Sequence, residues 1–255
     1  LGLITVMYNA QTGVLYHFSA FHIGFFAFIV TLAVGLTGVV VVKLRELEVK
    51  SIPEYYEIRF GKNVRVLGAI LLVVGGILNM GLFLKVGAIF IQGIFGIDSS
   101  GIALPIIMIT LLVMVLLYTM LGGMISVIIT DYIQFVVLSL GLIISVIIAV
   151  LHFGWSNIFT QLEILTNHSA AIYDPIQSRG GFYITWQVVL GFVSAVVWPT
   201  AITRALSLDS PQTVRKQYIW SSVSFLIRFM VPCFLGICAY IYYGGAVDDN
   251  TLMMM

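Results

Sequence analysis

Three polar side chains lie inside long apolar runs of this chain. Asn79, Asp131 and Arg228 are each flanked mainly by aliphatic and aromatic residues. Such groups are costly in hydrocarbon, and they commonly mark a substrate path, an ion path or a buried partner. All three are therefore candidate binding residues, although a helix–helix hydrogen bond or a salt bridge would also account for each of them.

Two prolines are expected to free backbone carbonyls within apolar segments. Pro232 has no amide to donate to the carbonyl of Arg228, four residues earlier, and its ring clashes with that carbonyl. Pro199 frees the carbonyl of Ala195 in the same way, and Trp198 lies beside that break. A binding site could use such carbonyls.

The depths of the two charged groups differ. At a rise of ~1.5 Å per residue, Asp131 lies ~9 Å past the start of its span at position 125, and Arg228 lies ~15 Å inside its own span. A carboxylate at that depth needs a cation or hydrogen-bond donors. Asp131 is thus an ion-path candidate, with a structural hydrogen bond as the alternative.

Residues typical of soluble enzymes are sparse. No His or Cys cluster has metal-ligand spacing, so sodium is the only metal ion considered below. His17 and His22 are read as interfacial or pore-lining residues. Cys233 and Cys238 are five residues apart in an apolar run, where a disulfide within one helix is geometrically poor. We expect neither an enzyme nor an organic cofactor.

The composition predicts an all-α, polytopic membrane protein in contact with lipid. Sixty per cent of the residues are hydrophobic, 9% are charged and the mean hydropathy is +1.09, whereas soluble domains carry about 25% charged residues. Uncharged runs of about 18 residues or more can each cross a bilayer. The net charge of +1 gives no reason to expect nucleic acid.

The apolar runs predict one transmembrane domain over residues 1–255. The chain begins at Leu1 and ends in LMMM, so we expect a truncated domain. The seven predicted spans are 1–17, 20–42, 66–95, 102–121, 125–150, 182–203 and 218–243.

The segment 42–65 holds ten of the 23 charged residues. Ser51 is a predicted N-cap, with Pro53 and Glu54 in the first turn and Gly61 as the stop, so a short surface helix is expected here.

Basic residues are unevenly divided between the two sides of the membrane. The 43–65 and 204–216 loops, which fall on one side by alternation, hold nine basic residues, whereas the opposite loops hold only Arg179. The positive-inside rule therefore predicts that the 43–65 loop is cytoplasmic in a multi-pass plasma-membrane protein.

Three motifs, in family order, resemble the sodium/solute symporter family. They are SIPEYYEIRFG (51–61), LYTMLGGMISVIITDYIQ (117–134), and PTAITR (199–204) followed by VPCFLGICAY (231–240). The resemblance implies a leucine-transporter-like fold of two inverted five-helix repeats, with substrate and sodium bound at breaks in the first and sixth core helices. The chain would cover core helices one to seven.

The resemblance also implies roles for single residues. Asp131 matches a family carboxylate linked to the sodium path, and Leu3 falls near the helix-one stretch whose carbonyls face sodium. Arg228 falls where sugar-carrying relatives place a substrate-contacting lysine.

The same comparison argues against a sugar as the solute. Val6, Met7 and Phe26 replace the acid–glutamine pair and the glutamate of sugar-carrying relatives. An apolar lining around one arginine suits a small carboxylate, which a guanidinium binds through two parallel hydrogen bonds. The expected substrate-binding residues are Arg228, Asn79, Trp198, Met7 and Phe26.

The expected activity is sodium-coupled symport of a small organic solute by alternating access. Two other functions fit the same residues. A transporter-like membrane sensor would carry a cytoplasmic signalling domain beyond Met255. A channel would show no concentrative uptake into vesicles.

The charge asymmetry makes a topology prediction. A cysteine placed at Lys50 or Ser210 should react with an impermeant maleimide only from the cytoplasmic side, and one at Thr166 only from outside. Labelling of position 50 on intact cells would overturn the orientation.

Overall fold

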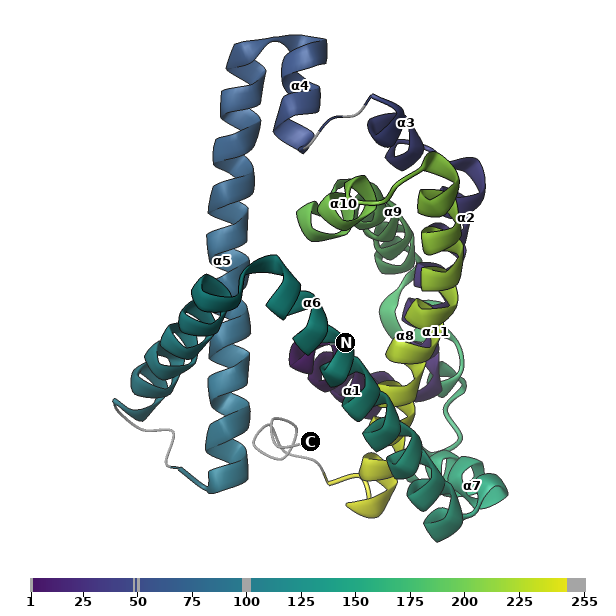
Figure 1. The fold of residues 1–255 in the computed structure, drawn as a ribbon. Helices are drawn as coiled ribbons and strands as arrows, with labels where there is room; N and C mark the ends of the chain where they lie inside the picture. The colour runs from purple at the N-terminus through teal and green to yellow at the C-terminus, as the bar shows by residue number, and fades with distance from the viewer. Residues whose placement is uncertain (1, 48, 50, 98–101, 247–255) are drawn as a thin grey trace. The chain divides into compact units, whose positions relative to one another are not determined.

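In a computed structural model, residues 2–47, 49, 51–97 and 102–246 are described, and they form helices without strands (Figure 1). Within these residues, five helical segments are long and apolar enough to cross a membrane, which confirms the all-α, polytopic prediction. They are Leu3–Thr37, Lys62–Phe95, Ala103–Gly123, Val127–Phe153 and Pro211–Tyr242.

The helices follow the chain in a simple order. They are α1 (Leu3–Tyr16), η1 (His17–Phe21), α2 (His22–Thr37), α3 (Val41–Glu46), α4 (Ile52–Phe60), α5 (Lys62–Phe95), α6 (Ala103–Phe153), α7 (Trp155–Leu165), η2 (Ala170–Ile172), α8 (Pro175–Arg179), α9 (Gly181–Val197), α10 (Pro199–Leu206) and α11 (Pro211–Tyr242).

The helix boundaries differ from the expected spans at two places. The expected spans 1–17 and 20–42 fall largely in one segment, interrupted at His17, whose φ is 54°. At the expected turn, Gly122–Gly123, helix α6 is kinked: Gly123 is non-helical with φ 59° and ψ −160°, and the two apolar segments on either side are Ala103–Gly123 and Val127–Phe153 (Figure 1). Glycine adopts that conformation without a Cβ penalty.

The surface helix α4 begins and ends as its sequence predicts. The Ser51 hydroxyl accepts a hydrogen bond from the Glu54 amide at 3.3 Å, and Gly61 follows the last turn with φ 90°. Arg65 forms an ion pair with Glu57, and the Tyr56 ring lies against Gly68. The helix therefore folds back along the start of α5. Glu48 and Lys50 of the charged loop lie outside the described residues.

Contacts divide the chain into two compact units. Unit 1 comprises Leu1–Phe21, Asn79–Asp174 and Arg228–Met255, and unit 2 comprises His22–Leu78 and Pro175–Ile227. The core of unit 1 is formed by Ile158, Leu162, Ile172, Phe234, Ile237, Cys238 and Ile241. The core of unit 2 is formed by Val34, Val41, Val42, Leu44, Val49, Ile52, Val196, Ile202, Ala205, Val214 and Tyr218.

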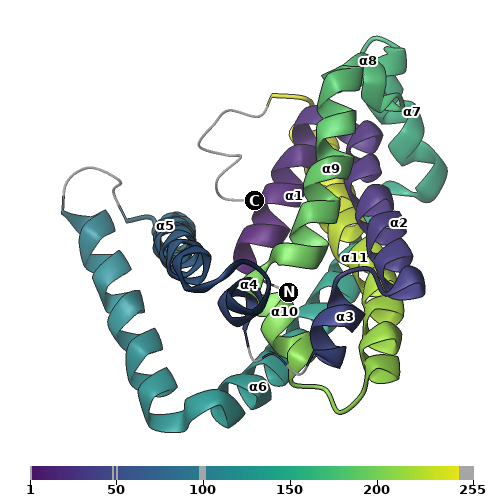
Figure 2. The same ribbon diagram turned by 90° about the horizontal axis from the view of Figure 1, so that it is seen from above.

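In unit 2, α2 packs against both α9 and the first part of α11 (Figure 2). His22 meets Tyr183, and Val30 lies opposite Gly191, so α2 and α9 run parallel. Gly35 contacts Tyr218, whereas Gly38 contacts Arg215, so α11 runs antiparallel to α2.

In unit 1, the backbones of α1 and α11 touch. A Cβ added at Gly13 would lie 2.1 Å from the carbonyl oxygen of Cys233, and one added at Gly236 would lie 2.0 Å from that of Ala10. Small residues permit this close approach, as is common between membrane helices. The two glycines therefore fix how α1 and α11 cross.

This crossing generates a stability prediction. Gly13→Ala or Gly236→Ala should lower the melting temperature of the detergent-solubilised protein, because overpacking against backbone costs about 1–3 kcal/mol. Gly75→Ala is the matched control, since a Cβ there meets nothing within 4 Å. Equal melting temperatures for all three variants would show that the two helices can separate without loss.

Candidate functional site

The helix that follows the long polar loop is broken at Trp198. Helix α9 ends at Val197 and α10 begins at Pro199, while Trp198 is extended with φ −62° and ψ 118°. A residue before proline avoids the helical conformation. The Trp198 amide still donates to the Ser194 carbonyl (3.2 Å), so the helical hydrogen bonds are lost only over a short stretch.

The carbonyl freed by Pro199 has acquired another donor. Tyr218, on α11, donates its hydroxyl hydrogen to the carbonyl oxygen of Ala195 at 3.0 Å. The Tyr218 side chain is buried in the core of unit 2. The sequence predicted the freed carbonyl but missed Tyr218, because only the packing of α11 against α9 shows which hydroxyl reaches it.

Two of the expected substrate-binding residues lie in unit 2. Trp198 is 45% exposed at the break. Phe26 is half-buried and its ring lies 6.1 Å from that of His22. His22 contacts Tyr183 and Val30 lies opposite Gly191, so Phe26 lies beside the part of α9 between Tyr183 and Gly191. That part of α9 is about two helical turns or more from Trp198. The structure does not bring these two side chains together.

The other expected site residues lie in unit 1. Leu3 and Met7 are half-buried on α1, and Asn79 is half-buried on α5. Asp131 is exposed on α6, beyond the Gly123 kink. Arg228 is half-buried on α11, with its guanidinium carbon 5.4 Å from the centre of the Phe229 ring.

The helical register of unit 1 relates some of these residues to one another. Leu3, Met7 and Ala10 share one face of α1, and Arg228, Pro232 and Gly236 share one face of α11. The two faces meet where Gly236 contacts Ala10. Arg228 lies eight residues before Gly236, ~12 Å along α11, and no contact described here joins it to Met7.

Asn9 is a second residue that the sequence analysis did not single out. It is fully buried on α1, and its amide nitrogen donates to the Thr5 carbonyl at 2.6 Å. Within the described part of the chain, its side-chain oxygen has no hydrogen-bond partner. A buried polar atom of this kind is costly unless a donor or a cation satisfies it.

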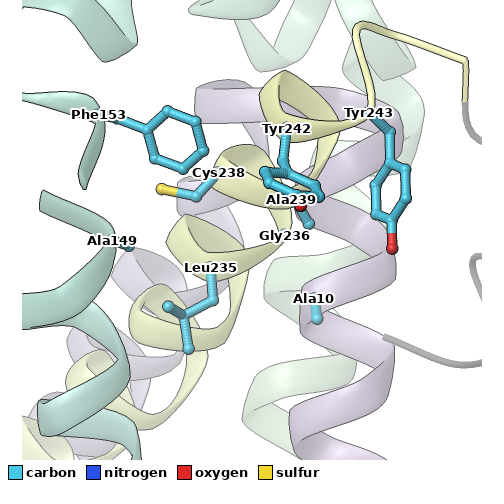
Figure 3. Close-up of a pocket in the computed structure, with 9 residues that line it drawn as sticks. All are labelled: Ala10, Ala149, Phe153, Leu235, Gly236, Cys238, Ala239, Tyr242 and Tyr243. Atoms are coloured by element: carbon cyan, nitrogen blue, oxygen red, sulfur yellow. The ribbon is translucent and has the colours of Figure 1, made fainter.

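A pocket of about 360 Å³ adjoins the same crossing (Figure 3). Its lining comes from α1, α6 and α11, and is mostly apolar apart from two tyrosines and one thiol. The lining residues are Ala10, Ala149, Phe153, Leu235, Gly236, Cys238, Ala239, Tyr242 and Tyr243. None of the expected substrate-binding residues is among them.

Over nearly its whole length, the chain is similar to a known protein family. The model of the sodium:solute symporter family matches residues 11–249. A protein described as a putative sodium-dependent multivitamin transporter, from Drosophila melanogaster, is 25% identical over 209 residues. That alignment covers 77% of this chain and 32% of the relative, so the chain spans about a third of the relative's length.

Proposed function

Since the chain belongs to the sodium:solute symporter family, we propose that it forms part of a transporter that couples sodium entry to uptake of a small organic solute by alternating access. The broken helix α9–α10 is the observation that carries this proposal. The relative described as a sodium-dependent multivitamin transporter supports both the coupling ion and a small organic solute. The activity is that of the full-length protein.

A broken helix suits transport for a physical reason. Non-helical backbone at membrane depth is tolerated only where protein buries it or where it lines a cavity, and transporters place their ligand sites at such breaks. Pro199 has no amide, and the amides just after it have no acceptor within α10. The positive end of a helix favours an anion.

Within unit 1, we propose that Arg228 binds the carboxylate of the solute. The guanidinium is half-buried in a predicted membrane span, where a charge needs compensation. Met7, on α1, remains a proposed apolar contact for the solute. Asn79 also remains a proposed solute-binding residue on α5. Phe26 and Trp198 remain proposed solute-binding residues of unit 2, considered by itself.

For sodium, we propose a path that includes Asp131. It is exposed on α6, beyond the Gly123 kink, and it is a carboxyl group within a predicted span. A carboxylate attracts a passing cation strongly where water is scarce. Leu3 remains a proposed backbone ligand on α1.

The role of Arg228 is tested by substitution in the full-length protein. Arg228→Gln should reduce uptake at least about tenfold, because charge-assisted hydrogen bonds are worth about 1.5–3 kcal/mol. Arg228→Lys keeps the charge but loses the bidentate fork, so the apparent KM should rise with modest loss of protein. Lys85→Gln is the matched control, since Lys85 is an exposed cation on α5.

A double variant separates the substrate role from a structural one. If Arg228→Gln with Asp131→Asn restores the abundance and uptake lost in Arg228→Gln alone, the two residues form an ion pair and the substrate role is wrong. Continued loss of uptake in the double variant, with normal abundance, supports the substrate role.

A separate prediction concerns coupling. Asp131→Asn should shift the sodium activation curve of uptake to several-fold higher sodium while the protein remains abundant in the membrane. Asp209→Asn, in an exposed loop, should leave the curve unchanged. An unaltered sodium curve for an abundant Asp131→Asn protein would make this carboxylate structural.

A further inference from the structure

The hydrogen bond between Tyr218 and Ala195 joins the broken helix to α11. The donor and acceptor residues are 23 positions apart in sequence, and the oxygen–oxygen distance is 3.0 Å. Ala195 lies four residues before Pro199, so its carbonyl is the one that an amide at position 199 would otherwise satisfy. We propose that Tyr218 is the positioning residue of the broken helix, with its hydroxyl in the role of the missing amide.

The Tyr218 side chain is held firmly enough for this role. It is 6% exposed and packs in the core of unit 2 with Val34, Val196 and Val214. A Cβ at Gly35 would lie 3.0 Å from the Cβ of Tyr218, so α2 also packs closely against this tyrosine. Three helices thus fix the direction in which the phenol points.

The hydroxyl has two consequences for the break. It satisfies a carbonyl that would otherwise be unpaired in a partly buried place, which is costly. It also ties the last turn of α9 to α11, so that Trp198 and the start of α10 keep one position relative to the two neighbouring helices. In transport, Tyr218 would determine the fraction of molecules in which the broken helix α9–α10 has the geometry that binds solute.

A double-mutant cycle tests the donor role, and it does not depend on the proposed function. Tyr218→Phe removes only the hydroxyl and should lower the melting temperature of the purified full-length protein by ~2–4 °C. In a Pro199→Ala background, the new amide can satisfy the Ala195 carbonyl, so Tyr218→Phe should then change the melting temperature by less than ~1 °C. Tyr56→Phe, which removes a hydroxyl from α4, is the matched control.

Uptake kinetics test the positioning role, which does rest on the proposed function. Tyr218→Phe should raise the apparent KM about three- to tenfold per molecule of folded protein, a change that loss of stability alone does not produce. An unchanged KM and kcat per folded molecule would leave the hydroxyl purely structural and overturn the positioning role. Equal effects of Tyr218→Phe on stability in the wild-type and Pro199→Ala backgrounds would overturn the donor role.

Discussion

The structure depends on one constraint, namely that every backbone polar group within a membrane needs a partner inside the protein. Pro199 violates the helical pattern that usually meets this need, and the Tyr218 hydroxyl restores it at Ala195. The burial of Tyr218 then requires α2, α9 and α11 to pack together, which Gly35 permits. The missing amide at Pro199 thus accounts for the position of the Tyr218 hydroxyl between α9 and α11.

The crossing of α1 and α11 also depends on close contact between backbones. Gly13 and Gly236 bring two backbones into contact, and a side chain at either position would collide with a carbonyl. Asn9, one residue before Ala10 at this contact, is fully buried. Rigid packing at the crossing holds the side chains near it in a fixed geometry.

Local features were predictable from the sequence, and long-range partners were not. The Ser51 cap, the Gly61 stop and the break before Pro199 depend on neighbouring residues alone, and all three are present. The interruption at Gly122–Gly123 also depends on local sequence, because glycine adopts the positive φ found at Gly123 without a Cβ penalty. Tyr218 could not be chosen from the sequence, since its partner lies 23 residues away on another helix.

The central claim is sodium-coupled uptake, and transport by the reconstituted full-length protein tests it most directly. Proteoliposomes with an imposed inward sodium gradient would be offered a panel of radiolabelled small carboxylates, with glucose for comparison. The account predicts accumulation of at least one carboxylate above its outside concentration, and loss of that accumulation when potassium replaces sodium. Equilibration without accumulation for every carboxylate, or accumulation that persists without sodium, would contradict it.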